Sequence, residues 1–553
     1  MRAHAPRCHP CLTCFFGARA ILFLAAFLIA ASAAAQKDPS PGASSRAKSR
    51  ADVARFRVRV ESALAEVHAQ KAYWGMVVAD RDTGETLYEL NADRFFTPAS
   101  NVKIFTTAFT LATLGSEFRF TTTLGSKSTL EADGRLAGDL VFVGYGDPDL
   151  SNRKFPFAGK PEREGPAAKI LAEMADEAVA KGLKVVDGDI VANDSIFPFD
   201  PYPAGWSTGD LFFAFGAPVG AIALNENAVS IEIRPGDRVG DPATIAVDPP
   251  AAADSLGLEI STSAGSDKPD FSVVRRPGLN FILLRGSVPL GTAPAKLDLA
   301  MTDPAETTAR TLKQLLEARG VRVAGGIRVQ HAPPPERKAS GEVSLVPPLV
   351  PPVLTGNYEV LRNFIEHTSP PLIESVRLTN KLSLNLHAEL FLRTIASQKV
   401  GIGTTDVGLT LEQDFLKAAG IPDGDVVLTD GSGLSANNLA TPHAMFQLLL
   451  YASRQPWGGD FISSLPTAGV DGTLENRMKG TPAAGAIQAK TGTLEHDHAI
   501  SGYATTIHGE HLVFAIFGNN NAQKGHDAVA ALDAICVAMV EELGAPSAKK
   551  KRK

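Results

Sequence analysis

A serine and a lysine three residues apart open an apolar stretch, "TPASNVKIFTTA" at residues 97–108. Thr97-Pro98 is typical of a helix entrance, and the apolar residues behind it recur at helical spacing. Residues three apart lie on one face of a helix, so the side chains of Ser100 and Lys103 can meet. A neutral lysine amine can remove the proton of a hydroxyl and make it a nucleophile. The alternative is an ordinary helix start, with Ser100 as the N-cap and Lys103 in solvent.

A second polar cluster follows a glycine-rich loop, "DGSGLSANNLATP" from Asp430. The pattern predicts that this loop delivers Ser435 and Asn437 just before a helix that starts near Thr441. A hydroxyl and an amide two residues apart can relay a proton and hold a substrate carbonyl. Taken alone, a Ser-x-Asn pattern is almost uninformative.

The third cluster, "QAKTGTLEHDHAISGY", places Lys490, Thr491, Gly492 and Thr493 at the start of a predicted strand. Glycine lets another group approach the backbone, the hydroxyls donate hydrogen bonds, and the lysine supplies a positive charge. These features suit an anion, and a carboxylate in particular.

Two histidines directly after this cluster, His496 and His498, raise the alternative of a zinc site. At positions i and i+2 of a strand they only share one face, and no third ligand lies at a suitable spacing. The sequence therefore predicts no metal and no other cofactor.

Strand patterns at both ends of the chain indicate one sheet built from distant segments. "WGMVVADRDTGETLYELN" predicts a hairpin that turns at residues 82–84, directly before the helix of Ser100. "AISGYATTIHGEHLVFAIFGNN" predicts a second hairpin that turns at 508–509, and a helix follows over about 526–543. The long middle of the chain is therefore predicted to be an insertion.

The middle of the chain, from about 120 to 330, consists of short strand-like runs separated by Gly, Pro and Asp. Two helical patterns interrupt it, near 166–182 and 303–319, and a strand follows each. This pattern of short strands and two helices predicts a mostly β insertion of two subdomains. A Pro-rich surface connection follows at 333–356.

Composition and charge exclude some classes of protein. With 553 residues, 44% of them hydrophobic, the chain predicts two or three domains, because single cores rarely grow beyond about 250–300 residues. The formal net charge is −6, and no basic cluster with aromatic residues precedes the C-terminal "KKKRK", so nucleic-acid binding has little support. That tail is interpreted as solvated, with weak attraction to anionic lipids or wall polymers as the alternative.

The N-terminus predicts export. Arginines precede the apolar run "ILFLAAFLIAASAAAQ", which is typical of a signal peptide over residues 1–35. A retained anchor is the alternative, although the run is short for a membrane span. Three of the four cysteines lie in this leader, and Cys536 lies in an apolar helical pattern that predicts a buried side chain. We expect an exported, periplasmic protein without an intrachain disulfide.

In the order S-x-x-K, S-x-N and K-T-G, the three clusters match the motif set of β-lactamases and penicillin-binding proteins. The chain resembles the low-molecular-mass penicillin-binding proteins of the D-alanyl-D-alanine carboxypeptidase/endopeptidase type over nearly all of its mature length. The long interval between Lys103 and Ser435 marks this family, as do "GYGDPDL" and "DSIFPFDPYPAGW" inside it. "NKLSLNLHAELFLR" and "AGVDGTLENRM" are also similar to family segments. The segment "NKLSLNLHAELFLR" departs from the usual family sequence around Leu382 and Leu384, which leaves the role of Asn385 open.

The resemblance implies an α/β (α+β) serine β-lactamase/transpeptidase-like domain, split in sequence, with inserted mostly-β subdomains. The expected division places the transpeptidase-like domain at 50–119 and 357–545, an inserted second domain at 120–219 and 301–332, an inserted third β domain at 220–300, and a basic tail at 546–553.

The resemblance also implies roles for the motif residues. Ser100 would attack the carbonyl of a D-Ala-D-Ala peptide to give an acyl-enzyme, with Lys103 as the base. Ser435 would pass a proton towards the leaving D-alanine, while Asn437 and Lys103 hold the cluster together.

The third cluster would receive the terminal carboxylate of the substrate, through Lys490, Thr491 and Thr493 around Gly492. The backbone N–H groups of Ser100 and Thr493 would form the oxyanion hole.

An acidic residue of the insertion, Asp194 in "VANDSIF", would meet the amine of the substrate's third-residue side chain. An ordinary turn aspartate is the alternative. The expected partners are peptidoglycan peptides as substrate and β-lactam antibiotics as inhibitors, with no nucleic acid and at most peripheral membrane contact.

Two other functions stay open at the level of sequence. One is a β-lactamase or esterase on the same scaffold, and the other is a non-catalytic peptidoglycan-binding protein. The sequence fixes neither the oligomeric state nor the balance between carboxypeptidase and endopeptidase activity.

Overall fold

The computed structural model describes residues 50–66, 69–159, 163–265, 268–275, 281–335, 361–522 and 526–544. The predicted signal peptide, the basic tail and most of the Pro-rich connection therefore lie outside the described residues. No helix within these ranges is both long and apolar enough to cross a membrane.

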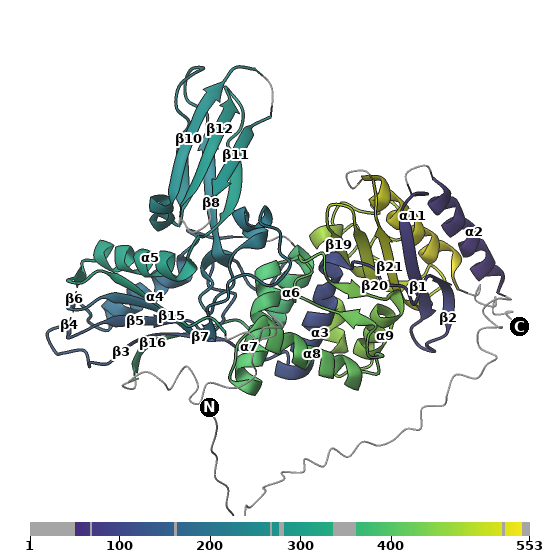
Figure 1. Cartoon of the computed structure of the whole chain (residues 1–553), viewed down its shortest axis with the longest axis horizontal. Coiled ribbons are helices and arrows are strands. Elements are labelled where there is room, and N and C mark those ends of the chain that lie inside the picture. Colours follow the sequence, from purple (N-terminus) through teal and green to yellow (C-terminus); the bar gives the residue numbers. More distant parts are fainter. Residues whose placement is uncertain are drawn as a thin grey trace, which may run out of the picture. The chain divides into compact units, whose positions relative to one another are not determined.

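One antiparallel sheet combines the two ends of the chain, as the sequence predicts (Figure 1). Its five strands run in the order β19-β20-β21-β1-β2, and β1 pairs antiparallel with β21. Both predicted hairpins are confirmed, β1–β2 and β20–β21. The strands are β1 (Tyr73–Asp80), β2 (Thr86–Leu90), β19 (Ile487–Thr493), β20 (His498–Thr505) and β21 (His511–Asn519).

Successive side chains of a strand point to opposite sides of the sheet, and here both sides carry hydrophobic residues. Val77 and Ala79 of β1 belong to a core shared with α3 (Val102–Leu114) and α9 (Pro442–Ser453). Met76 and Val78 belong to a core shared with α2 (Ala51–Ala65) and α11 (His526–Glu542). The predicted C-terminal helix is thus confirmed, and its Cys536 is buried, as expected.

The remaining helices of this region pack around α3, ten of whose residues are buried, from Val102 to Leu111. The start of α9 is confirmed near Thr441, whose hydroxyl accepts the Ala444 N–H at 3.0 Å. The other elements here are α6 (Leu372–Leu382), α7 (Asn385–Val400), α8 (Thr405–Ala418), α10 (Gly458–Ser464), η6 (Gly472–Leu474), β17 (Val426–Val427) and β18 (Leu439–Ala440).

The middle of the chain forms a second five-stranded sheet of order β15-β7-β5-β3-β16 and three three-stranded sheets, β14-β6-β4, β13-β8-β9 and β10-β12-β11. Both predicted helices of this region are present, α4 (Lys169–Ala180) and α5 (Pro304–Ala318). The larger sheet contains β3 (Thr121–Ser126), β5 (Leu140–Val143), β7 (Ile190–Pro198), β15 (Ile327–Ala332) and β16 (Arg362–Thr368).

The smaller sheets and short helices complete this region. The strands are β4 (Arg135–Leu136), β6 (Val185–Val186), β8 (Ala228–Arg234), β9 (Thr244–Asp248), β10 (Leu256–Ser263), β11 (Asp270–Arg275), β12 (Ile282–Pro289), β13 (Ala295–Ala300) and β14 (Arg322–Val323). The short helices are η2 (Asp210–Phe212), η3 (Ala214–Gly216), η4 (Leu224–Asn227) and η5 (Pro250–Ser255).

The strand β16 departs from the expected division of the chain, which places residues from 357 onward in the transpeptidase-like domain. It pairs antiparallel with β3 and so completes the edge of the second sheet before the chain enters α6. Its large apolar residues, Phe364 and Ile365, are adjacent, so no alternation reveals a strand in the sequence. Pairing with an otherwise open edge gives this segment its structure.

Candidate active site

Ser100 lies in a short helical turn, η1 (Ala99–Asn101), that leads directly into α3. Ala99 has a φ of +49°, a left-handed conformation that is uncommon outside glycine and asparagine. Lys103 follows one turn later with no exposed surface, and its Nζ lies 3.0 Å from Ser100 Oγ. The predicted meeting of these two side chains is confirmed, and the alternative of a solvated lysine is wrong.

Two glycines let other segments approach the backbone before Ser100. A Cβ at Gly433 would lie 2.0 Å from the Ala99 carbonyl oxygen, and Gly433 has a φ of +78°. A Cβ at Gly492 would lie 2.5 Å from the Pro98 carbonyl oxygen. The close approach expected at Gly492 is therefore real, and the approaching group is the backbone beside Ser100.

The Lys103 amine has three polar neighbours: Ser100 Oγ at 3.0 Å, Asn385 Oδ1 at 2.6 Å and the Ser432 carbonyl oxygen at 2.5 Å. A neutral amine has two N–H groups and one lone pair, which match two carbonyl oxygens and one hydroxyl proton. Burial lowers the pKa of Lys103 to about 7, although the carboxylates of Asp430 and Glu389 oppose this shift. The site thus favours the form of the lysine that can accept a proton.

The expected contact between Lys103 and Asn437 is wrong, because the amide at the lysine belongs to Asn385. The Asn437 side chain is exposed, and the buried Ser435 hydroxyl lies 2.9 Å from Thr429 Oγ1. The Asp430 carboxylate accepts the N–H groups of Gly433 and Ser435 at 2.7 Å each. This curls the loop so that it presents the Ser432 carbonyl to the lysine.

The chain contains a second Ser-x-Asn triplet, Ser383-Leu384-Asn385, between α6 and α7. Ser383 ends α6 in the left-handed conformation, with a φ of +61°, and its Oγ accepts the Lys490 Nζ at 3.0 Å. Asn385 also donates from Nδ2 to the Phe215 carbonyl at 2.8 Å. Sequence reasoning left the role of Asn385 open and missed Ser383, although the segment "NKLSLNLHAELFLR" carried the signal.

Lys490 lies in the middle of the edge strand β19, not at its start, and is fully buried. Its Nζ also donates to the Thr491 carbonyl at 2.7 Å. Burial, together with the positive charge of Lys103, holds the pKa of Lys490 well below its usual range. Burial and the repulsion between two ammonium groups therefore oppose the positive charge that the sequence predicted for Lys490.

Thr491 and Thr493 differ in what their side chains reach. The Thr491 hydroxyl lies 2.7 Å from Thr473 Oγ1, so it is held within the protein. Thr493 lines a cavity of about 660 Å³ that also contains Ser100.

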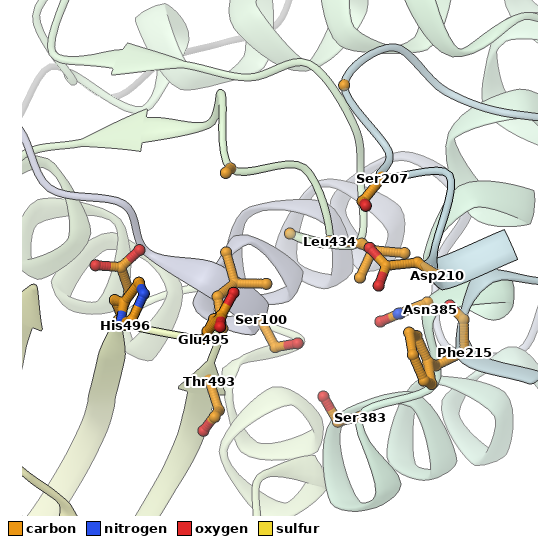
Figure 2. A pocket seen from close by; sticks show the side chains of 15 residues that line it. Ser100, Ser207, Asp210, Phe215, Ser383, Asn385, Leu434, Thr493, Glu495 and His496 are labelled. Atoms are coloured by element: carbon orange, nitrogen blue, oxygen red, sulfur yellow. Dashed lines mark hydrogen bonds between the residues drawn. The ribbon is translucent and has the colours of Figure 1, made fainter. Parts of the chain in front are cut away.

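Five segments of the chain line this cavity (Figure 2), and they include the loop residues Gly433, Leu434 and Ala436. Figure 2 shows Ser100 at its centre, with Ser383 and Asn385 on one side and Thr493 on another. The lining from the middle of the chain is Gly205, Ser207, Asp210 and Phe215, and the lining after Thr493 is Leu494, Glu495, His496 and Asp497.

Asp194 does not line the cavity of Ser100. It lies in a separate cavity with Phe199 and Tyr202, and its Oδ1 is 2.8 Å from Nδ1 of His331. The acidic residue that the middle of the chain contributes to the cavity of Ser100 is Asp210, whose pKa burial raises. Sequence reasoning missed Asp210, because nothing in its local pattern marks it.

The two histidines after the third cluster have no metal-like surroundings. His496 Nδ1 lies 2.9 Å from the Asn521 carbonyl oxygen. Across the described ranges, no group of three or more His, Cys, Asp or Glu side chains is arranged to hold a metal ion.

Comparisons with known proteins find relatives along most of the chain. A model of the D-Ala-D-Ala carboxypeptidase 3 (S13) family matches residues 56–346 and 356–539. The chain is 32% identical over 500 residues to a D-alanyl-D-alanine carboxypeptidase of Actinomadura sp. (strain R39), which covers 88% of this chain and 85% of that protein. It is 24% identical over 450 residues to the D-alanyl-D-alanine carboxypeptidase DacB of Haemophilus influenzae, covering 80% and 85%.

The fold has a solved counterpart. The crystal structure of penicillin binding protein 4 from Haemophilus influenzae superimposes with a TM-score of 0.71 at 22% identity, covering 87% of this chain and 98% of that chain. This match confirms the predicted serine β-lactamase/transpeptidase-like fold. With the family model spanning most of its length, the chain belongs to the D-Ala-D-Ala carboxypeptidase 3 (S13) family.

Proposed function

We propose that the protein is a serine-type D-alanyl-D-alanine carboxypeptidase that acts through an acyl-enzyme on Ser100. The observation that carries this proposal is the buried Lys103 amine, 3.0 Å from Ser100 Oγ and with a pKa of about 7. An amine with a pKa of about 7 is about half neutral at neutral pH, and its neutral form can activate the hydroxyl as a general base.

In the acylation step, Lys103 accepts the proton of Ser100 as Oγ bonds to the carbonyl carbon of the substrate. The negative charge that develops on the carbonyl oxygen meets the N–H groups of Ser100 and Thr493. Each such donor can lower the barrier by roughly 3 kcal/mol. Thr493 lines the same cavity as Ser100, which supports this pairing.

Departure of D-alanine requires a proton on its nitrogen as the C–N bond breaks. We assign this transfer to Ser383 in place of Ser435, because Ser383 Oγ lines the cavity and is held by Lys490 Nζ at 3.0 Å. The proton that Lys103 took from Ser100 balances the one that the leaving amine receives. Water then attacks the ester, releases the shortened peptide and restores the Ser100 hydroxyl.

The carboxylate of the terminal D-alanine binds near Thr493 and the charge of Lys490. Arrival of an anion favours the charged form of this buried lysine, so substrate binding itself restores the positive charge. Thr491 and Gly492 act here through the backbone of β19, since the Thr491 hydroxyl is held by Thr473.

The substrates in this proposal are peptidoglycan peptides, and β-lactams are the inhibitors. A free amine on the third residue of the peptide meets Asp210, an acidic side chain on the cavity wall near Phe215 and Asn385 (Figure 2). Asp210 takes the role that the sequence assigned to Asp194. An exported, periplasmic location with peripheral membrane contact at most follows from the N-terminal sequence and from such a substrate.

The first prediction concerns the nucleophile. Penicillin should add covalently to Ser100, and the Ser100→Ala protein should fold but take no label, as mass spectrometry of intact protein and peptides can measure. Labelling at another residue would contradict the assignment. Rapid turnover of penicillin would indicate a β-lactamase, and absence of any adduct would indicate a non-catalytic protein.

The second prediction separates the two Ser-x-Asn triplets. Ser383→Ala and Asn385→Ala should each lower the rate constant of acylation by about 10²-fold or more, since proton transfer and the position of Lys103 depend on them. The matched variants Ser435→Ala and Asn437→Ala should stay far closer to wild type. Stopped-flow acylation with a chromogenic β-lactam measures all four. The reverse order of losses would refute the assignment.

The third prediction tests the contact with the substrate amine. Asp210→Asn should lower kcat/KM for peptides with a free side-chain amine at the third residue by up to about fivefold, because one partly exposed ion pair contributes up to about 1 kcal/mol. Acetylation of that amine should remove the difference from wild type. Asp194→Asn is the control and should show no such dependence on acetylation. An acetylation-dependent loss in Asp194→Asn alone would restore the original assignment.

A further inference from the structure

A buried carboxyl group behind the Lys103 amine has no part in the mechanism above. Glu389 lies on α7, one turn after Asn385, and has no exposed surface. Its Oε1 accepts the backbone N–H groups of Gly431 and Ser432, each at 2.9 Å. Its Oε2 has no hydrogen-bond partner among the described residues.

The two peptide groups that Glu389 holds also face α3. The Thr106 hydroxyl donates to the Gly431 carbonyl at 2.8 Å, and Lys103 Nζ donates to the Ser432 carbonyl at 2.5 Å. The loop backbone is therefore fixed from α7 through its N–H groups and from α3 through its carbonyls. Glu389 and Lys103 are linked through a single residue, Ser432.

We propose that Glu389 is a positioning residue for Lys103, because it holds the Ser432 carbonyl against the lysine amine and adds its charge to the electrostatic field there. This inference rests on the proposed role of Lys103 as the base that activates Ser100. It gives a reason for a carboxyl group in a dry core, where an unused one would be costly.

The charged groups around Glu389 and Lys103 determine the direction in which each pKa shifts. Asp430 and Lys490 also face Lys103. Asp430, Arg393 and Glu412 face Glu389. Burial raises the pKa of Glu389 to about 8, and Asp430 adds to this shift. Glu389 and Lys103 therefore titrate in overlapping ranges, as a coupled pair.

Ionised Glu389 favours the protonated form of Lys103, which is inactive as a base. The rate constant of acylation should rise with pH as the lysine loses its proton. Removing the carboxylate should let the lysine become neutral at lower pH.

The variant Glu389→Gln separates charge from position, because the glutamine oxygen can still accept both N–H groups. The acidic limb of the acylation rate constant against pH should move down by about one pH unit, the scale of one nearby charge. Glu412→Gln is the matched control: Glu412 is also fully buried, with a pKa raised by burial to about 8, and both its oxygens lack a hydrogen-bond partner within the described ranges. Glu412 and Glu389 repel each other when both are ionised, so the loss of Glu412 makes Glu389 easier to ionise, and the limb of this variant should not move down.

Two further variants test position itself. Glu389→Ala loses both the charge and the two hydrogen bonds, so acylation should slow by about 10²-fold, the cost of a base displaced by about 1 Å. Glu389→Asp keeps the charge on a shorter side chain and should recover part of the alanine loss, with its limb above that of Glu389→Gln. Circular dichroism checks folding.

An unmoved limb in Glu389→Gln, or an equal shift in Glu412→Gln, would overturn the inference. The wild-type protein distinguishes this result from a failure of the proposed function. If penicillin does not acylate wild-type Ser100, the proposed function and the role of Glu389 are both refuted. If penicillin acylates wild-type Ser100 but the acidic limb of Glu389→Gln does not move, only the proposed role of Glu389 is refuted.

Discussion

Lys103 is a fully buried side chain that would carry a charge in water, and the surroundings of the site follow from this constraint. Its amine meets two carbonyl oxygens and one hydroxyl, supplied by Asn385, Ser432 and Ser100. Because a buried ammonium loses its hydration, the neutral form gains, and the pKa falls to about 7. Each contact comes from a different segment, so the fold must bring α3, α7 and the loop after Asp430 to one point.

The split chain achieves this convergence. Residues from both ends form one sheet, and its edge strand β19 runs beside the turn that carries Ser100, where Asn101 Nδ2 donates to the Lys490 carbonyl at 3.2 Å. The middle of the chain supplies another wall of the cavity, through Asp210 and Phe215. Trp206 ties this wall to the loop, since its Nε1 donates to Asp430 Oδ2 at 2.9 Å. The proposed catalytic residues lie on the transpeptidase-like domain, and the proposed specificity residue, Asp210, lies in the inserted middle of the chain.

Patterns that are local in sequence predicted much of the fold and half of the site. Helical spacing showed that Ser100 and Lys103 could meet, and the two hairpins predicted the sheet. The second motif could not be placed this way, because Ser-x-Asn occurs twice and only tertiary packing decides which copy faces Lys103. Asp430 turns one copy away, while the left-handed Ser383 turns the other inward. Asp210 and β16 were missed for the same reason, since their partners lie far away in sequence.

The central claim is that Lys103 is the base and that burial makes it neutral near physiological pH. The most direct measurement is the second-order rate constant for acylation of the wild-type protein by penicillin between pH 5 and pH 9. The account predicts a rise with increasing pH whose midpoint lies near 7, because the lysine becomes active as it loses its proton through a pKa of about 7. A rate that is independent of pH across this range, or that still rises without levelling at pH 9 as an ordinary lysine would require, would contradict it.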